Sequence, residues 1–305
     1  MSNTWFVIVN PTSGNGASKM KWPLIFKELT TQNISFNFEI TKHKNHAIEI
    51  VKTAIKKGYT HFICVGGDGT LHTIVNGILS VNPSNLNDII LGIIPIGTGN
   101  DWVKTYNIPL DFKKAIKIIK EQYTVNQDFG KIDIINTAKT VYFNNLAGIG
   151  FDGYVVNKVH KFKNLGFLAY LVGAIVSITS YKKPTLKIEF NNSKIQQKTL
   201  MLLIGLCKYS GGGMQLTKDP NPTDGLFDIS IIYKINLITI LKNITNLFNG
   251  KICNHKLVHN HKTNILKVEV LDKNKAYIQA DGELIGTGDF SISILQNSLN
   301  FIVPK

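Results

Sequence analysis

The sequence predicts an α/β first domain with a parallel sheet and a mainly β, sandwich-like second domain. In the first part of the chain, apolar runs typical of buried strands alternate with helical segments, which favours parallel strands. After about residue 127, strand-like segments with turn signals between them predominate. We therefore expect domains at 1–127 and 128–305, and we leave open whether the last strand returns to the first domain.

The first domain alternates strand and helix four times. This order implies parallel strands with helices on both faces of the sheet, and in such sheets ligands bind at the carboxyl ends of the strands. The expected strands are Trp5–Val9, Ile34–Ile40, Phe62–Val65 and Ile89–Ile94, and the expected helices are Lys19–Leu29, Ala47–Lys57, Leu71–Leu79 and Phe112–Lys120.

The second domain carries six segments with strand character and two with helix character. The longest apolar stretch, Leu165–Thr179, is shorter than the ~20 residues needed to span a bilayer. We expect it to be a buried or half-buried helix, with contact to a membrane surface or acyl chains as the alternative. The expected strands are Thr185–Phe190, Leu200–Leu206, Phe227–Ile232, Ile265–Val270, Ala276–Ala280 and Phe290–Leu295, with helices near Leu165–Ser180 and Leu237–Asn249.

The composition describes a basic globular protein. The 305 residues carry a formal net charge of +14, and every cationic side chain other than histidine is lysine. Nucleic acid, anionic lipid and acidic substrates are compatible with this charge, but no nucleic-acid-binding motif is found, so we expect no nucleic-acid partner. Three cysteines are too few for a disulfide framework, and Met1 leads directly into a strand-like segment. We therefore expect reduced thiols in a cytoplasmic protein.

Three glycine-containing loops follow strands of the first domain. They are Asn10-Pro11-Thr12-Ser13-Gly14, Gly66-Gly67-Asp68-Gly69-Thr70 and Gly97-Thr98-Gly99-Asn100-Asp101. Glycines at strand ends let backbone N–H groups approach a ligand closely, so the loops predict a site for a nucleotide phosphate chain. A single aspartate in a turn usually caps the backbone. Because Asp68 and Asp101 lie in matching loops, we favour Mg²⁺ coordination for this pair.

Three other motifs each have two interpretations. Thr41 closes a strand, where its hydroxyl group could reach a nucleotide or cap the next helix. Asp281-Gly282-Glu283 also follows a strand, and its glutamate is either a general base or part of a plain hairpin turn. The segment Asp219–Leu226 is either a turn or an oxygen-rich cation site.

The order of these motifs, together with Gly148–Gly153 and Thr223–Gly225, resembles that of the diacylglycerol-kinase-like lipid kinases. These include the bacterial soluble diacylglycerol kinases and the sphingosine and ceramide kinases. The match extends over essentially the whole chain. The Gly66–Thr70 motif is shared with NAD kinases, so NAD kinase is the alternative enzyme, and a non-catalytic nucleotide- or lipid-binding protein is a further alternative.

The resemblance implies a site in which ATP is held by the first domain. By this similarity, Asp68 and Asp101 organise Mg²⁺ around the phosphates, and Glu283 is the general base that accepts the proton of a lipid hydroxyl group. The residues expected to contact ATP are Asn10, Pro11, Thr12, Ser13, Gly14, Thr41, Gly66, Gly67, Asp68, Gly69, Thr70, Leu71, His72 and Thr98.

The resemblance also implies a structural Mg²⁺ site in the second domain, held by Asp224 and the carbonyl group of Leu226. Asn221 stands where bacterial members have an acid, so this site carries less negative charge. His72 and Thr73 likewise depart from the residues common at those positions. The expected partners are ATP, a lipid alcohol and an anionic membrane surface at which the protein is peripheral. The identity of the acceptor, the lysine that neutralises the transferred phosphate and the oligomeric state, a homodimer included, stay open.

Overall fold

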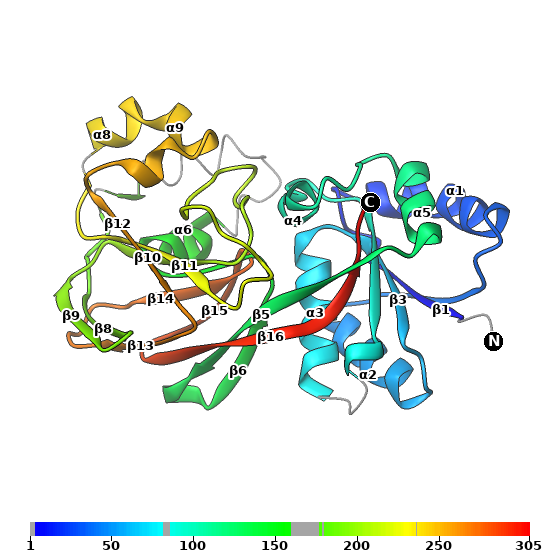
Figure 1. Ribbon diagram of the computed structural model, residues 1–305, viewed down its shortest axis with the longest axis horizontal. Helices are drawn as coiled ribbons and strands as arrows, with labels where there is room; N and C mark the ends of the chain where they lie inside the picture. Colours follow the sequence, from blue (N-terminus) through cyan, green and yellow to red (C-terminus); the bar gives the residue numbers. More distant parts are fainter. Residues whose placement is uncertain (1–3, 82–85, 160–176, 179, 236) are drawn as a thin grey trace. The chain divides into compact units, whose positions relative to one another are not determined.

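The computed structural model describes residues 4–81, 86–159, 177–178, 180–235 and 237–305. They form two compact units, one comprising Met1–Asp128 and Gln296–Lys305 and the other Phe129–Leu295 (Figure 1). Two long strands, β5 (Thr124–Ile134) and β16 (Phe290–Ile302), each contribute residues to both units. The second unit is therefore inserted into the chain of the first.

The first unit is built on a parallel sheet, as the sequence predicts. β1 (Trp5–Val9) lies between β2 (Phe36–Ile40) and β3 (His61–Gly66), and β3 also pairs with β4 (Ile90–Pro95). The end of β16 adds a further parallel strand beside β4. β1 and β3 are buried along their whole length, whereas β2 is the edge strand and is largely exposed.

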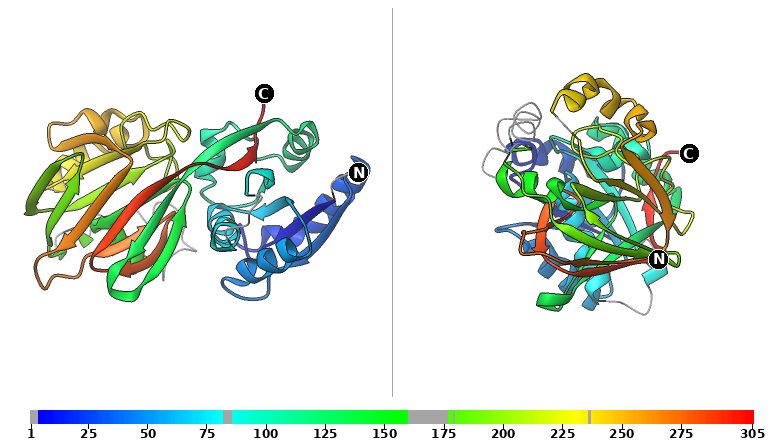
Figure 2. Two further views of the ribbon diagram at one scale, coloured as in Figure 1. Left: turned by 60° about the horizontal axis from the view of Figure 1, so that its bottom comes forward. Right: turned by 90° about the vertical axis from the view of Figure 1, so that its left-hand side faces the viewer.

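Helices cover both faces of this sheet (Figure 2). Ile25 and Ile116 belong to the same apolar cluster as Val7 of β1, so the helices that carry them share one face. The helices that carry Val51 and Gly77 also pack closely together. A Cβ atom built on Gly77 would lie 3.0 Å from the Val51 side chain. The helices are α1 (Ala17–Thr31), α2 (His46–Lys56), α3 (Asp68–Val81), α4 (Asp101–Thr105) and α5 (Phe112–Glu121), with the 3₁₀ turn η1 (Leu86–Asp88).

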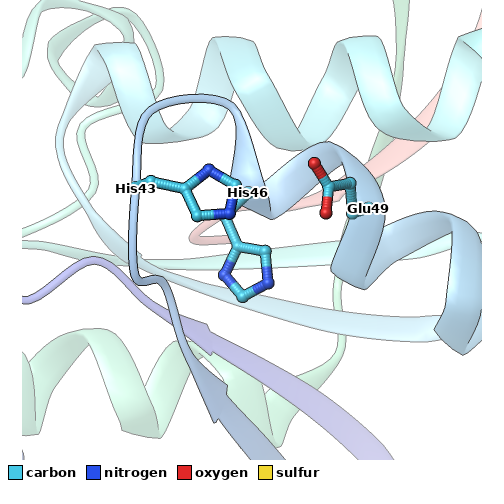
Figure 3. A group of neighbouring side chains, drawn as sticks. All are labelled: His43, His46 and Glu49. Atoms are coloured by element: carbon cyan, nitrogen blue, oxygen red, sulfur yellow. The ribbon is translucent and has the colours of Figure 1, made fainter.

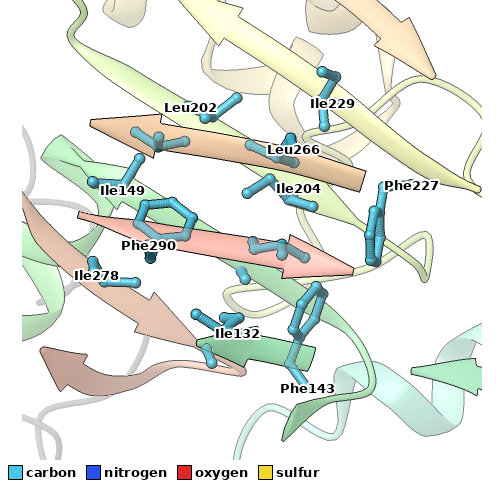
Figure 4. Packing of buried hydrophobic residues seen from close by; sticks show 14 of the residues in the cluster. Ile132, Phe143, Ile149, Leu202, Ile204, Phe227, Ile229, Leu266, Ile278 and Phe290 are labelled. Atoms are coloured by element: carbon cyan, nitrogen blue, oxygen red, sulfur yellow. The ribbon is translucent and has the colours of Figure 1, made fainter. Parts of the chain in front are cut away.

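The second unit contains antiparallel strands in two layers, which confirms the prediction of a mainly β domain. Inward-facing side chains of both layers, such as Ile204 from one and Leu266 from the other, share one buried cluster (Figure 4). One sheet has the order β12 (Val258–Thr263), β11 (Phe227–Ile232), β10 (Met201–Gly205), β7 (Leu146–Gly150), β14 (Tyr277–Ala280) and β15 (Glu283–Thr287). The other layer contains β6 (Lys139–Phe143), β8 (Thr185–Phe190), β9 (Ser193–Lys198) and β13 (Ile265–Val270), with parts of β5 and β16.

The predicted helices of this unit need one correction. In place of a helix over Leu237–Asn249, the structure has α8 (Leu237–Lys242) and α9 (Ile244–Phe248). Asn243 separates them, and its side chain donates to the carbonyl of Thr239 at 2.8 Å. Asparagine competes for backbone hydrogen bonds in this way and so favours helix ends. The predicted helix at Leu165–Ser180 lies almost entirely outside the described residues.

The remaining short elements are α6 (Phe151–Val159), η2 (Ile135–Thr137) and η4 (Lys251–Asn254). In the described part of the chain, no helix has the length and apolar character needed to cross a bilayer.

Candidate functional site

The first two loops of the first unit are joined through the hydroxyl group of Thr70. The Asn10 side chain donates to Thr70 Oγ1 at 2.9 Å, and Ser13 Oγ lies 3.1 Å from the same atom. Asn10 also accepts hydrogen bonds from the backbone N–H and the hydroxyl group of Thr12. The turn after β1 and the first turn of α3 are therefore fixed to each other at the carboxyl edge of the sheet.

The second and third loops approach so closely that only glycine fits at their crossing. A Cβ atom built on Gly97 would lie 2.6 Å from the Cα atom of Gly67, and one on Gly67 would lie 2.8 Å from the Cα atom of Gly97. Side-chain atoms essentially never come this near to another backbone. Both glycines are thus required by packing, and the backbones of the two loops meet directly.

The carboxylate of Asp68 connects the same two loops. Its Oδ2 accepts the backbone N–H of Asp101 at 3.0 Å, and its Oδ1 accepts that of Trp102 at 3.1 Å. These N–H groups are the first two of α4 and have no partner within that helix, so Asp68 satisfies them. Asp68 lies in the first turn of α3, which begins three residues before the expected helix start at Leu71.

Asp101 is buried and paired with a lysine. Its Oδ1 lies 2.8 Å from Nζ of Lys104, one turn further along α4. The sequence analysis did not single out Lys104, although the spacing of three residues on a helix is a signal that could have found it. The structure therefore places one carboxylate in each of the linked second and third loops, with one ammonium group on α4 beside the carboxylate of the third loop.

The other residues that were predicted to contact ATP differ in how far their side chains are exposed to solvent. Leu71 and His72 are buried in α3, and His72 Nε2 lies 3.4 Å from the amide nitrogen of Asn76. Thr98 is exposed in the loop between β4 and α4. The structure thus brings Asn10, Ser13 and Thr70 into one hydrogen-bonded group and Asp68 and Asp101 into a second, and both groups include residues of the second loop. The side chains of Leu71 and His72 are instead buried within the packing of α3.

Thr41 is followed by a turn that contains His43 and then by the first turns of α2, which carry His46 and Glu49 (Figure 3). The ligand atoms of His43, His46 and Glu49 lie within 4.8 Å of one another, a spacing that a metal ion could bridge. However, His46 Nδ1 accepts the backbone N–H of Lys42 at 3.1 Å, which places the proton of the neutral ring on Nε2. His46 therefore lacks a free lone pair, and we assign its side chain to fixing the turn after Thr41.

In the second unit, Glu283 begins β15 after a tight turn. Asp281 and Gly282 both have positive φ values, 49° and 78°, which is the geometry of a two-residue hairpin turn. Glu283 is half-buried and pairs with Ala280 across the hairpin. The hairpin interpretation of this motif is thus correct for the backbone, and it places the glutamate on a strand rather than in a loose loop.

This hairpin is fixed by Asp281, whose role the sequence analysis did not predict, and by Gln279, which it did not name. The Asp281 carboxylate accepts three backbone N–H bonds, from Asn144, Asn145 and Leu146, at 3.1, 2.9 and 3.2 Å. Gln279 accepts the N–H of Gly282 at 2.9 Å. Because backbone bonds carry no side-chain signal, the sequence alone could not reveal the Asp281 contacts.

Gln279 also donates to a half-buried acid on α6. Its Nε2 lies 2.5 Å from Oδ2 of Asp152. Burial raises the pKa of the Asp152 carboxyl to about 6, while the bond from Gln279 acts in the opposite direction. The turn that carries Glu283 is thus connected through Gln279 to a carboxyl group whose pKa lies above its usual range.

The side chains of two of the predicted metal residues in the second unit, Asn221 and Asp224, already have partners within the protein. Asn221 Oδ1 accepts from the backbone and hydroxyl groups of Thr223, and Asp224 Oδ1 accepts the N–H of Leu226 at 3.0 Å. Asp224 Oδ2 lies 3.3 Å from Nζ of Lys262 on β12. Each of these oxygens therefore faces a hydrogen-bond donor.

Lys262 also contacts a second acid. Its Nζ lies 3.3 Å from Oδ2 of the buried Asp228 on β11. Burial raises the pKa of Asp228 to about 6, Lys262 opposes that shift, and Asp224 and Asp219 add to it. An ammonium group thus supplies the positive charge between the carboxylates. These residues fit a divalent cation poorly, because the fixed ammonium would repel it.

Comparison with known proteins places this arrangement in a family. Residues 4–132 match the family described as diacylglycerol kinase catalytic domain, and residues 145–303 match the one described as YegS C-terminal NAD kinase beta sandwich-like domain. The diacylglycerol kinase of Bacillus subtilis (strain 168) is 28% identical over 301 residues, covering 98% of this chain and 96% of that protein. That of Staphylococcus haemolyticus (strain JCSC1435) is 29% identical over 301 residues, covering 98% and 88%.

A solved structure has the same fold. The crystal structure of a diacylglycerol kinase from Bacillus anthracis str. Sterne superposes with a TM-score of 0.74 at 20% identity, covering 99% of this chain and 97% of that one.

Proposed function

Because the chain belongs to the family that combines the diacylglycerol kinase catalytic domain with the YegS C-terminal domain, and is a diacylglycerol-kinase-like lipid kinase, we propose that it transfers the γ-phosphoryl group of ATP to a lipid hydroxyl group. Diacylglycerol is the first acceptor to test, since the relatives carry that name. A sphingoid base and other lipid alcohols are the competing acceptors.

The observation that carries this proposal is the joining of the three loops at one edge of the first unit. Thr70 connects the first loop to the second, and Asp68 connects the second to the third. A rigid edge lined by glycine N–H groups and hydroxyl groups suits a phosphate chain, whose oxygens are acceptors. We assign ATP binding to this edge, with Asn10 to Gly14, Thr41, Gly66 to Thr70 and Thr98 as its contacts, whereas the buried side chains of Leu71 and His72 support the first turns of α3 from within.

Phosphoryl transfer depends mainly on positioning and on charge neutralisation. Mg²⁺ bound with ATP would neutralise phosphate charge. Because both Asp68 oxygens accept backbone N–H groups and Lys104 faces Asp101, we propose that these two acids would hold the ion through water rather than directly. Lys104 is a positioning residue in this proposal, because its ammonium group fixes the direction of the Asp101 carboxylate. The chain has no arginine, so lysine must provide any side-chain cation at the phosphates.

Glu283 is our candidate general base. It would accept the proton of the lipid hydroxyl group as that oxygen bonds to phosphorus, a contribution typically of about 10²–10⁴-fold. The support for this role is the rigidity of its hairpin, which Asp281 and Gln279 hold to neighbouring backbone. A base on a fixed strand starts from a defined backbone position, so only its side chain must be ordered for the reaction.

The acceptor resides in a membrane, so we also propose that the protein works at a bilayer surface facing the cytoplasm. Attraction of lysines to an anionic surface is worth roughly 1 kcal/mol for each residue near the lipid. The excess of lysine, with a formal net charge of +14, supports this partner.

The test is phosphorylation of a total lipid extract with labelled ATP and mass identification of the product, with NAD as a separate acceptor. Phosphatidic acid as the main product supports the proposal. Formation of NADP without lipid product would instead establish the NAD kinase alternative, and binding of ATP without turnover of any acceptor would indicate a non-catalytic protein.

A further inference from the structure

The indole ring of Trp102, on α4, contacts both of the long strands that contribute residues to the two units. Its Nε1 donates to Oε1 of Gln127 on β5 at 2.9 Å, and its ring centroid lies 4.5 Å from that of Phe301 on β16. All three side chains are fully buried. The helix α4 is therefore fixed to β5 and β16, within the parts of these strands that belong to the first unit.

Gln127 supplies the polar part of this connection. Tyr106, at the end of α4, donates its hydroxyl group to the same Oε1 atom at 2.8 Å. An amide oxygen has two lone pairs, so a single oxygen can accept both donors. A glutamine side chain that is 0% exposed is costly unless it is hydrogen-bonded in this way. Hydrogen bonds are directional and apolar packing is not, so these two bonds restrict how α4 can shift.

The backbone of the same tryptophan contacts the acid pair. The N–H of Trp102 donates to Oδ1 of Asp68 at 3.1 Å, and the N–H of Asp101 donates to Oδ2 of Asp68 at 3.0 Å. Asp101 itself lies in the first turn of α4. A shift of the indole would therefore move the N–H groups that Asp68 accepts, together with the backbone that carries the Asp101 carboxylate. Trp102 thus connects Gln127, through its side chain, to both acids, through its main chain.

The two strands that hold the indole are also bonded to each other at the boundary of the first unit. Asp128, the residue after Gln127, accepts the backbone N–H of Asn297 on β16 at 2.8 Å. The first unit ends at Asp128 and resumes at Gln296, so this bond lies at its boundary. Groups held on paired strands are positioned more precisely than groups held on loops. The support of α4 is therefore a fixed pair of strands.

We propose that Gln127 is a positioning residue for the acid pair Asp68 and Asp101. By holding the Trp102 indole it sets the position of α4, and through α4 the direction of both carboxylates at the edge that we assign to ATP. The catalytic part of this inference rests on the proposed function, whereas the position of α4 does not depend on any activity. A packing role alone is the competing explanation, because any buried polar group stabilises a fold when it is bonded.

The first experiment measures amide hydrogen exchange in the full chain of Gln127→Leu, which removes the acceptor oxygen. We expect the amides of Asp101 and Trp102 to exchange at least tenfold faster than in wild type, beyond any change at the amides of β3, which report on global stability. Leu29→Ala is the control, because it removes a fully buried side chain from α1. It should not accelerate the two α4 amides more than those of β3. The same even pattern in Gln127→Leu would overturn the inference.

The second experiment measures turnover of the soluble acceptor dioctanoylglycerol. A displacement of about 1 Å in a site can cost roughly 10²-fold in rate. We therefore expect Gln127→Leu to lose at least tenfold in kcat, with a KM for dioctanoylglycerol within twofold of wild type. Gln196→Leu, at an exposed position of β9, is the control and should keep wild-type kinetics. A kcat of Gln127→Leu within twofold of wild type would overturn the positioning role, even if its α4 amides exchange faster.

The triple variant Gln127→Leu/Trp102→Phe/Tyr106→Phe separates positioning from packing. It replaces the acceptor and both donors by apolar side chains, so these bonds leave no buried partner behind and the urea midpoint should return toward that of wild type. The directional bonds are still missing, so kcat should stay at least tenfold below wild type and the Asp101 amide should still exchange fast. Recovery of kcat together with the urea midpoint would show that Gln127 only packs, and would overturn the inference.

Amide exchange separates this inference from the proposed function. If wild type phosphorylates no lipid, the proposed function fails, while faster exchange confined to the α4 amides in Gln127→Leu still supports the placement of the acid pair by Gln127. If wild type phosphorylates dioctanoylglycerol and Gln127→Leu has wild-type exchange and turnover, the positioning inference alone is overturned.

Discussion

Asp68 accepts the backbone N–H of Asp101 at 3.0 Å, so one of the two candidate acids caps the helix that carries the other. The second oxygen of Asp68 accepts the next N–H, that of Trp102, at 3.1 Å. A change at Asp68 therefore alters the position of Asp101 as well as its own charge. The positions of the two acids are therefore coupled, so variants of either must be tested for both stability and activity.

Replacing Asp68 by Ala will lower stability as well as activity. The substitution leaves two backbone N–H groups of α4 without their acceptor, at a cost of about 1–3 kcal/mol in the free energy of unfolding. Asp68→Asn keeps one acceptor oxygen, so it should lose less stability while still losing most of the activity. Urea unfolding and initial rates on the folded protein measure the two effects. Wild-type stability of Asp68→Ala would contradict the capping role.

Replacing Glu283 by Gln will reduce phosphorylation by about 10²–10⁴-fold with little change in the urea midpoint. The amide has the shape of the carboxylate but cannot accept the hydroxyl proton, and the half-buried position tolerates it. Glu121→Gln, at an exposed position of α5, is the control. A Glu283→Gln enzyme with wild-type turnover would remove this residue as the base.

Replacing Lys262 by Met will make the stability of the second unit depend on Mg²⁺. The wild-type ammonium lies 3.3 Å from both Asp224 and Asp228, and its loss leaves two carboxylates facing each other without a cation. We expect a loss of about 1–3 kcal/mol, which millimolar Mg²⁺ partly restores in the variant and not in wild type. Lys194→Met, at an exposed ion pair, is the control. Equal stabilisation of wild type by Mg²⁺ would show that the predicted metal residues bind the ion despite Lys262.

The pH dependence of stability should differ between wild type and Asp152→Asn. Burial raises the pKa of Asp152 to about 6 in the folded state, above the value of about 3.9 in an unfolded chain. Between about pH 4 and pH 6 the folded state therefore holds more protons, so the free energy of unfolding falls as the pH rises. Above pH 6 both states are ionised and the loss is complete, at roughly 3 kcal/mol at most.

Urea unfolding at several pH values between 4 and 7 measures this effect as a difference between the two proteins. The asparagine variant lacks the titration, so wild type should lose stability relative to it over that window. Asp228, whose pKa is also raised to about 6, is present in both proteins and cancels from the difference. Parallel stability profiles would contradict the assignment to Asp152.

Much of the fold was predictable because it follows from hydrophobic pattern. β1 and β3 are continuous apolar runs, and the alternation of strands with helices implied the parallel sheet that the first unit contains. The pattern was less informative at helix ends. α3 begins at Asp68 although Gly69 lowers its intrinsic helix propensity, because tertiary bonds to α4 fix the first turn.

The candidate site was predictable only in part. The glycine loops and Glu283 carry sequence signals, but their connections do not. The three N–H bonds to Asp281 involve backbone groups of residues more than a hundred positions away. Lys262 is likewise separated by a long stretch of chain from Asp224, and an exposed lysine on a strand has no distinctive pattern. Such contacts depend on strand register, which hydrophobic periodicity does not determine across distant segments.

β5 and β16 each contribute residues to both units, and this limits which fragments of the protein can be expressed separately. A fragment ending at Asp128 would lack the segment Gln296–Lys305 and would leave β4 as an unprotected edge strand. Bare edges of that kind pair with other chains and aggregate. The smallest version of the first unit suited to expression is therefore a fusion in which a short linker joins residue 128 to residue 296.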